Sequence, residues 1–208
     1  MPYPIAKYTV LHLAKALWIK KVNGLSNIPK DEPFIYASNH GSFIDDLLIP
    51  CVIFGHVKKY VHFYCNDKFF KNFFTRKFLE WGRVIPIRVY ESPNQKEINK
   101  KAFNLALDYL KKNEPVGIFP EGHRTTDGEL QKARTGVATL AIKSNVPVVP
   151  IGIIGSYKIW PKGKRLPTLN KCIINIGKPM QFKTNDKEKI TKDIMIKIAE
   201  LADLKYNY

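Results

Sequence analysis

Short apolar segments alternate with helical segments along most of this chain, and this alternation restricts the folds available to it. Helical periodicity is clearest in residues 69–81, 95–112 and 136–143 and in a last segment that begins near Asn185. Between the helical segments lie short runs typical of strands, at residues 33–38, 61–65, 84–89, 116–119, 146–154 and 171–177. Strands that alternate with helices usually form a parallel or mixed sheet covered by helices. We therefore predict an α/β sandwich with a mostly parallel or mixed central sheet.

The 208 residues contain no internal repeat, glycine–serine linker or low-complexity segment that would divide them. A chain of this size with 45% hydrophobic residues can bury one sizeable core. We predict one domain, residues 1–208, with an N-terminal helix in residues 1–25. Pro147 and Pro150 indicate an edge position or irregular pairing for their strand. Asn185 and Glu188 resemble a capping box at the start of the last helix.

The first candidate motif, NHGSFID at residues 39–45, lies where the strand at 33–38 ends and a helix begins. A neutral imidazole at His40 can take a proton from an alcohol, and a carboxylate on its other nitrogen fixes the tautomer and stabilises the imidazolium. This chemistry requires no serine or cysteine nucleophile. The spacing alone is weak, because His40 can equally be a turn histidine and Asp45 a helix cap. Asp46 is a second possible partner of His40, although a residue at a helix start more often caps than catalyses.

The second candidate motif, FPEGHRT at residues 119–125, follows the strand at 116–119 in a tight turn. Arg124 offers a planar and permanently charged group that suits phosphate. A base with an orienting acid, together with an anion-binding arginine, suggests acyl transfer onto a phosphorylated alcohol.

These motifs belong to a set of sequence blocks, which are NHGSFID at 39–45, GRVIPIR at 82–88, FPEGHRT at 119–125 and VPVVPI at 146–151. In this order the blocks resemble the glycerolipid acyltransferases, whose typical member is 1-acylglycerol-3-phosphate acyltransferase. The resemblance covers about residues 30–155, which form the motif-bearing core. It implies transfer of a fatty acyl group from acyl-coenzyme A or acyl carrier protein to the free hydroxyl of lysophosphatidate, giving phosphatidate without a metal or cofactor. Glycerol 3-phosphate, another lysophospholipid and a different lipid alcohol are alternative acceptors.

The resemblance also implies roles for individual residues. His40 would be the general base, and Asp45 its partner. Many members carry a lysine where this chain has Asn66, so we expect either that Lys68 substitutes from a shifted position or that the acceptor head group differs. The substrate-binding residues implied in this way are Lys68, Arg88, Glu121, Gly122 and Arg124, of which the two arginines would hold the phosphate. Backbone amides near Gly41 or Gly122 are candidate donors to the oxyanion, without a definite assignment.

The chain is strongly basic, with 34 Lys and Arg against 18 Asp and Glu and a net charge of +16. Such a charge attracts nucleic acid, an anionic membrane, coenzyme A or an acidic carrier protein, and it is also typical of a lysine-rich soluble surface. No nucleic-acid recognition motif is evident, so we expect no nucleic-acid partner. A metal hydrolase using His40, Asp45, Glu121 and His123 is an alternative, but no H-E-x-x-H pair is present. The three cysteines have no spacing typical of zinc or disulfides and fit a reducing compartment.

No segment reaches eighteen uninterrupted apolar residues, so we expect a peripheral protein on the cytoplasmic side of a membrane, without a signal peptide. Residues 5–22 are apolar but carry scattered lysines, which fits membrane docking or packing over the core. Residues 69–81 carry five phenylalanines and Trp81 around half of a helix, which fits core packing or lipid contact. The basic loop at 156–170 could cover the site, bind phosphate, touch a membrane or simply be solvated. A non-catalytic membrane-binding relative is a further alternative.

Overall fold

The computed structural model describes the backbone of residues 6–208 and the side chains from residue 12 onward, and it contains one continuous sheet of seven strands. The strand order is β1-β7-β6-β2-β5-β3-β4, and every neighbouring pair is parallel except β6 and β7. The strands are β1 Ile19–Asn23, β2 Ile35–Ser38, β3 His62–Asn66, β4 Ile85–Ile87, β5 Val116–Ile118, β6 Val148–Ile154 and β7 Cys172–Ile176. The predicted α/β fold with a mostly parallel, mixed sheet is confirmed.

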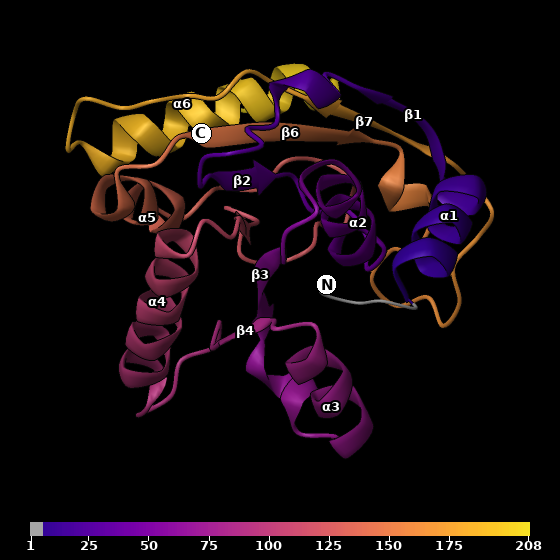
Figure 1. Ribbon diagram of the computed structural model, residues 1–208, viewed down its shortest axis with the longest axis horizontal. Coiled ribbons are helices and arrows are strands. Elements are labelled where there is room, and N and C mark those ends of the chain that lie inside the picture. Colours follow the sequence, from indigo (N-terminus) through magenta and orange to yellow (C-terminus); the bar gives the residue numbers. More distant parts are fainter. Residues whose placement is uncertain (1–5) are drawn as a thin grey trace.

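Helices cover both faces of this sheet (Figure 1). They are α1 Ala6–Trp18, α2 Asp45–Val57, α3 Phe73–Trp81, α4 Gln95–Lys111, α5 Gly136–Ser144 and α6 Lys187–Ala202. Three short 3-10 turns, at Leu25–Asn27, Asp67–Phe70 and Ser156–Lys158, complete the elements. Figure 1 shows α4, α5 and α6 along one side of the sheet, α1 and α2 on the other, and α3 projecting away from both layers beyond β4.

Alternation along β2 divides the core into two layers. Tyr36 points into the cluster that contains α2 residues such as Leu48, whereas Ile35 and Ala37 point into the cluster formed with α4, α5 and α6. Gly117 of β5 lies against the Tyr36 ring, and a Cβ atom at this position would overlap it. The central strand pair therefore requires a glycine at residue 117.

The predicted N-terminal helix ends earlier than expected. Residues 1–5 lie outside the described part of the chain, α1 ends at Trp18, and Ile19–Asn23 forms the edge strand β1. Val22 pairs with Ile174 of β7, and Ile19 and Val22 pack against the core while Lys20 and Lys21 are exposed. Pairing with a distant strand thus overrides the apolar helical pattern, and the prediction of an N-terminal helix in residues 1–25 is wrong beyond Trp18.

Two further predictions need correction. The strand that contains Pro150 is not at the edge, because β6 lies between β2 and β7. Pro150 has no N–H to donate, but its carbonyl accepts a hydrogen bond from Gly177 N at 2.8 Å, so the strand keeps its central place. The cap of α6 is Asp186 and not Asn185, since the Asp186 side chain accepts a hydrogen bond from Lys189 N at 3.0 Å.

No helix in the described part of the chain combines the length and apolar character needed to cross a membrane.

The residues expected to form one aromatic helix at 69–81 are divided in two. The 3-10 turn ends at Phe70, and α3 begins at Phe73, where the Asn72 side chain accepts hydrogen bonds from Phe74 N and Thr75 N.

Candidate active site

The predicted site residues gather at one edge of the sheet because their strands are parallel. The carboxyl ends of β2, β5, β3 and β4 meet at the same edge, where ligands bind in open α/β sheets. His40 follows β2, Lys68 follows β3, and Arg88 follows β4 directly. The turn at residues 119–125 follows β5. The order of the strands therefore brings together segments that are far apart in the sequence.

His40 and Asp45 form the contact that the family resemblance implies. His40 Nδ1 lies 3.1 Å from Asp45 Oδ2, and this oxygen also accepts hydrogen bonds from Gly41 N at 2.9 Å and Ser42 N at 2.7 Å. Asp45 begins α2 and is completely buried. In a neutral imidazole, Nδ1–H donates to this carboxylate and the lone pair stays on Nε2. The contact thus prepares Nε2 to accept a proton.

The imidazole of His40 is also held by the second motif. Its ring stacks on Phe119 with a centroid distance of 3.9 Å and an angle of 15°. His40 N donates to Glu121 Oε1 at 2.9 Å, and His40 O accepts from Thr125 N at 2.9 Å. The other oxygen of Glu121 accepts from Gln131 N at 2.7 Å. Glu121 therefore joins the two motifs.

Both carboxylate oxygens of Glu121 accept hydrogen bonds from backbone N–H groups. Its side chain is almost fully buried, and burial raises the pKa of Glu121 to about 7, against the opposing effect of the two backbone N–H donors. Glu121 thus holds the backbone of His40 and of Gln131 in place. This arrangement fits the expectation that Glu121 shapes the site.

Asp46 faces the other ring nitrogen of His40. Its Oδ2 atom lies 4.0 Å from His40 Nε2, and its side chain is 29% exposed. Burial raises the pKa of Asp46 to about 6, although the neighbouring His40 and Arg124 lower it and Asp45 raises it further. Two carboxyl groups therefore flank the imidazole, one on each nitrogen. The sequence favours a helix-capping role for Asp46, whereas the structure places it beside Nε2 of His40.

A polar cavity of about 330 Å³ lies in front of His40. Its lining includes five of the predicted site residues and, in addition, the basic residues Arg134 and Lys162. The predicted residues in the lining are His40, Lys68, Arg88, Gly122 and Arg124. Lys162 belongs to the basic loop noted in the sequence, whereas no motif pointed to Arg134. The cavity is therefore more basic than the motifs alone indicated.

The two arginines of the motifs differ in how far their charges are already satisfied. Arg88 Nε donates to Asp67 Oδ2 at 2.7 Å, and Arg88 Nη1 donates to Ser92 Oγ at 3.2 Å. Hydrogen bonding to Asp67 raises the pKa of Arg88 above its ordinary value. Arg124 instead lies over the Phe43 ring at 3.3 Å from the centroid, and its Nη1 is buried without a hydrogen-bond partner among the described residues. Arg124 therefore has more capacity to bind an anion.

Asn66 acts locally as a cap. Its Oδ1 atom accepts a hydrogen bond from Lys68 N at 3.0 Å at the start of the 3-10 turn, so this oxygen is already used. The Lys68 ammonium lies 5.0 Å from the Phe69 ring centroid, and Lys68 lines the polar cavity beside Asn66. The position of Lys68 fits its expected role as a shifted cation.

The candidate oxyanion donors at the two glycines are already occupied. Gly41 N donates to Asp45 Oδ2 at 2.9 Å, and Gly122 N donates to Phe119 O at 3.0 Å within its turn. Neither amide is free to bind an oxyanion in this arrangement.

No group of three or more His, Cys, Asp or Glu side chains among the described residues is placed to hold a metal ion.

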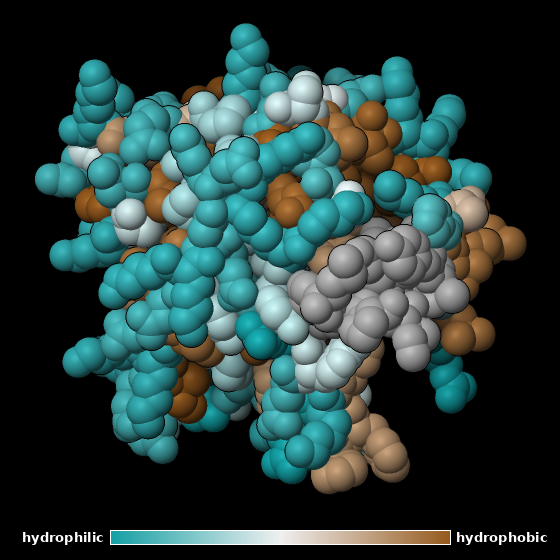
Figure 2. All heavy atoms as spheres, in the orientation of Figure 1, coloured by the Kyte–Doolittle hydropathy of each residue, from teal (hydrophilic) through white to brown (hydrophobic). Residues whose placement is uncertain are grey.

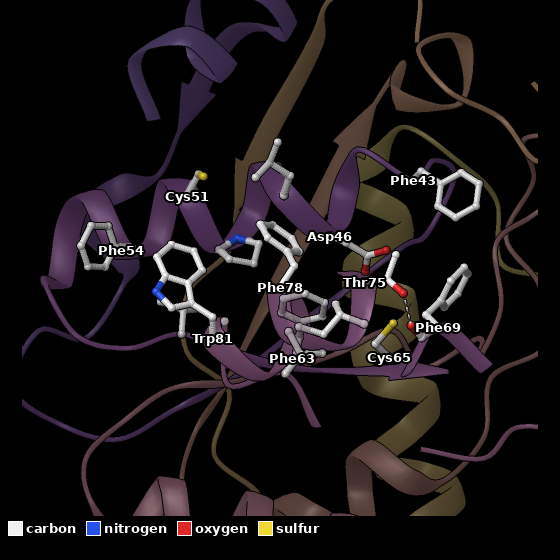
Figure 3. A pocket seen from close by; sticks show the side chains of 16 residues that line it. Phe43, Asp46, Cys51, Phe54, Phe63, Cys65, Phe69, Thr75, Phe78 and Trp81 are labelled. Atoms are coloured by element: carbon white, nitrogen blue, oxygen red, sulfur yellow. Dashed lines mark hydrogen bonds between the residues drawn. The ribbon is translucent and has the colours of Figure 1, made fainter. Parts of the chain in front are cut away.

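A second cavity, of about 560 Å³ and lined mainly by apolar side chains, lies between α2, β3 and α3. Figure 3 shows Phe43, Asp46 and Phe69 at one end of it and Phe54 and Trp81 at the other. The two cavities share four lining residues, which are Phe43, Asp46, Cys65 and Phe69. Burial raises the pKa of Cys65 to about 12, so this thiol stays protonated and is a poor nucleophile. Together the cavities form an apolar chamber that meets a basic one beside His40.

Comparisons with known proteins identify relatives of this chain. Residues 20–154 match the sequence model of the family described as Acyltransferase. The chain is 33% identical to a chloroplastic 1-acyl-sn-glycerol-3-phosphate acyltransferase of Brassica napus, over 68% of this chain and 39% of the relative. It is 31% identical to one of Arabidopsis thaliana, over 88% and 49%. It is 28% identical to the 1-acyl-sn-glycerol-3-phosphate acyltransferase of Bacillus subtilis, over 77% and 73%.

The chain spans about half or less of the length of the two plant relatives. Among solved structures, the 1-acyl-sn-glycerophosphate (LPA) acyltransferase PlsC of Thermotoga maritima has the same fold, with a TM-score of 0.71 and 24% sequence identity. That likeness covers 98% of this chain and 83% of the other.

Proposed function

This chain belongs to the Acyltransferase family, and we propose that it transfers a fatty acyl group from an acyl thioester to the free hydroxyl of lysophosphatidate, giving phosphatidate. The observation that carries the proposal is the orientation of His40. Its Nδ1 is held by the buried Asp45, and the ring lines a basic cavity that meets an apolar one. The relatives from Brassica napus and Arabidopsis thaliana, which carry this activity in their names, support the same assignment.

In the proposed reaction, His40 Nε2 takes the proton of the acceptor hydroxyl while the hydroxyl oxygen attacks the thioester carbonyl carbon. Asp45 stabilises the imidazolium that forms. The tetrahedral intermediate then collapses, the carbon–sulfur bond breaks, and the proton passes from Nε2 to the leaving sulfur. An ester and a free thiol result, and His40 returns to its neutral form. One side chain serves as base and then as acid.

The basic cavity would hold the phosphate of the acceptor. Arg124 supplies a buried, unpaired N–H donor, and Lys68, Arg134 and Lys162 add positive charge to the same lining. Arg88 would contribute less, since Asp67 already binds its guanidinium. The same donors suit other phosphorylated acceptors, so glycerol 3-phosphate and other lysophospholipids are the alternatives to test.

The apolar cavity would hold an acyl chain, with the reacting carbonyl near the residues that the two cavities share. Its lining is mainly apolar, and Phe54 and Trp81 lie at the end opposite Phe43, Asp46 and Phe69 (Figure 3). Acyl-coenzyme A and acyl carrier protein are both candidate donors, because each carries negative charge that a chain of net charge +16 attracts. As its substrates are lipids, we propose that the protein works as a peripheral protein on the cytoplasmic face of a membrane.

The test is transfer of a radiolabelled acyl group from acyl-coenzyme A, and in parallel from acyl carrier protein, to lysophosphatidate. We expect labelled phosphatidate from at least one donor with the wild-type chain and none with His40→Ala. The controls are His56→Ala, since His56 lies near the end of α2 and lines neither cavity, and circular dichroism of each variant. Equal product from wild type and His40→Ala would end the assignment of the base. If product forms only with another acceptor, the proposed acyl transfer stands and the proposed acceptor is wrong.

A further inference from the structure

Helix α3 exposes a set of large apolar side chains on the surface of the molecule. Phe73, Phe74, Phe78 and Trp81 are 58%, 80%, 66% and 52% exposed, and no residue of α3 is buried. We call these four residues the α3 surface. Figure 1 shows the helix projecting beyond the sheet, and Figure 2 shows hydrophobic atoms at the same tip of the molecule. A helix that exposes so much aromatic area in water marks an interaction surface.

The α3 surface is continuous with the apolar cavity. Phe78 and Trp81 belong to both, because each is more than half exposed and each also lines the cavity. Phe73 and Phe74 are exposed but do not line it. A lipid chain could therefore move from a hydrocarbon phase on α3 into the cavity past Phe78 and Trp81 without crossing water.

Basic side chains accompany the aromatic ones. Arg76 and Lys77 lie on α3 itself, and Lys71 lies two residues before its first residue, Phe73. Arg76 and Lys77 approach Glu80 at 3.7 and 3.6 Å, so one carboxylate faces two cations. Aromatic rings beside lysine and arginine are the chemistry that prefers the interface of an anionic bilayer. The excess positive charge of the whole chain acts in the same direction.

We propose that the α3 surface docks this protein on an anionic phospholipid bilayer, with Phe73 and Phe74 in the interface and the mouth of the apolar cavity facing the lipid. The proposal rests on the proposed function only for what enters the cavity. The docking itself follows from the exposed rings, the adjacent cations and the continuity with the cavity. A second copy of the chain would bring the same positive charges together, and an acidic carrier protein would match the cations but not the open apolar mouth.

The experiment measures co-flotation of the full chain with vesicles of phosphatidylcholine alone and with vesicles that also contain phosphatidylglycerol. The test variant is Phe73→Ser with Phe74→Ser, because neither residue lines a cavity. The matched control is Ile196→Ser, which removes a 41% exposed side chain from α6 on another part of the molecule. Thermal unfolding followed by circular dichroism verifies that each variant is folded.

A second pair of variants tests the charges. Arg76→Gln with Lys77→Gln removes two cations from α3, and Lys101→Gln with Lys111→Gln removes two exposed lysines from α4 that likewise approach a carboxylate. Each cation beside an anionic surface is worth about fivefold in binding, so we expect the α3 pair to lose roughly 25-fold on vesicles with phosphatidylglycerol. The α4 pair is expected to lose much less.

We expect the wild type and Ile196→Ser to float with the anionic vesicles and the Phe73/Phe74 variant to lose binding by at least about tenfold. Transfer to a short-chain, monomeric lysophosphatidate should stay close to wild type in that variant, while transfer to lysophosphatidate in vesicles falls. Undiminished flotation of the Phe73/Phe74 variant would overturn the proposal. So would a wild-type chain that ignores vesicles and instead forms a dimer or binds acyl carrier protein through α3. Flotation that depends on α3, without any acyl transfer, would retain the docking surface and reject the proposed function.

Discussion

Replacing Asp45 by asparagine is expected to slow acyl transfer by about three orders of magnitude, whereas the same change at Asp46 is expected to slow it about fivefold. The two residues are neighbours in the chain and face different nitrogens of His40. Asp45 Oδ2 lies 3.1 Å from Nδ1 and Asp46 Oδ2 lies 4.0 Å from Nε2. Comparing the two variants therefore separates the effect of the Asp45 charge, which orients His40 through Nδ1, from that of the Asp46 charge, which lies beside the reacting Nε2.

The magnitudes follow from burial. For a unit charge beside the imidazolium at about 4 Å, Coulomb's law gives about 4 kcal/mol at the effective dielectric constant of a protein site and about 1 kcal/mol in water. Asp45 is completely buried, so the interaction energy of about 4 kcal/mol applies to it. Each 1.36 kcal/mol corresponds to a factor of ten in rate. The Asp46 side chain is 29% exposed, so solvent screens its charge and the energy is closer to about 1 kcal/mol.

The assay is single-turnover acyl transfer with saturating donor and acceptor, so that the chemical step is measured. Asparagine keeps an oxygen that can accept the hydrogen bonds of Gly41 and Ser42, and circular dichroism should show both variants folded. Burial raises the pKa of Asp46 to about 6, so it is neutral below that pH. Rates of the wild type and Asp46→Asn should therefore converge as the pH falls below 6. A loss smaller than tenfold in Asp45→Asn, or a larger loss in Asp46→Asn, would refute the assignment of Asp45 as the orienting acid.

Three further outcomes are expected. Arg124→Gln should raise KM for lysophosphatidate by about tenfold or more and by more than Arg88→Gln does, with little change in KM for the donor, because Arg124 has the unpaired donor; equal effects on both substrates would move the phosphate elsewhere. Glu121→Gln should make the free energy of unfolding less dependent on pH. In the wild type, burial raises the pKa of Glu121 to about 7 in the folded state, so the free energy of unfolding in urea titrations should fall by on the order of 3 kcal/mol as the pH rises from about 4.5 to 7. Gly117→Ala should destabilise the fold by at least about 3 kcal/mol through overlap with the Tyr36 ring, and Tyr36→Leu should recover part of that loss in thermal melts.

The sequence predicted the strands that form the centre of the sheet well, because their apolar runs are short and lie between polar turns. It failed at β1, where Ile19–Asn23 continues an apolar segment that looks helical. That segment becomes a strand only because β7 pairs with it, and the partner is about 150 residues away. It also failed to place Pro150 inside the sheet, because the carbonyl interaction with Gly177 cannot be read from local sequence.

The contact between His40 and Asp45 could be predicted from the resemblance of the ordered motifs to a known family, because the spacing of the two residues alone is also typical of a turn histidine and a helix cap. For Asp46 the sequence offered contact with His40 only as a second possibility, and it did not indicate that Asp46 faces the other ring nitrogen. Arg134 lines the same cavity from a segment without regular structure, and no spacing in the sequence signals its presence there. The unequal environments of Arg88 and Arg124 depend in the same way on neighbours, here Asp67 and Phe43.

The shared wall of the two cavities offers a physical reason for Asp46 in the proposed reaction. A phosphate attracted to the basic cavity must not enter the apolar one, where its charge would be desolvated without a partner. Asp46 lines both cavities, and its pKa of about 6 makes it ionised near neutral pH. A carboxylate at this junction repels phosphate from the apolar side, while Arg124 binds phosphate on the basic side. An uncharged acyl chain is not repelled by this carboxylate. Asp46 can therefore favour the orientation in which the acyl chain points toward Trp81 and the phosphate lies beside Arg124.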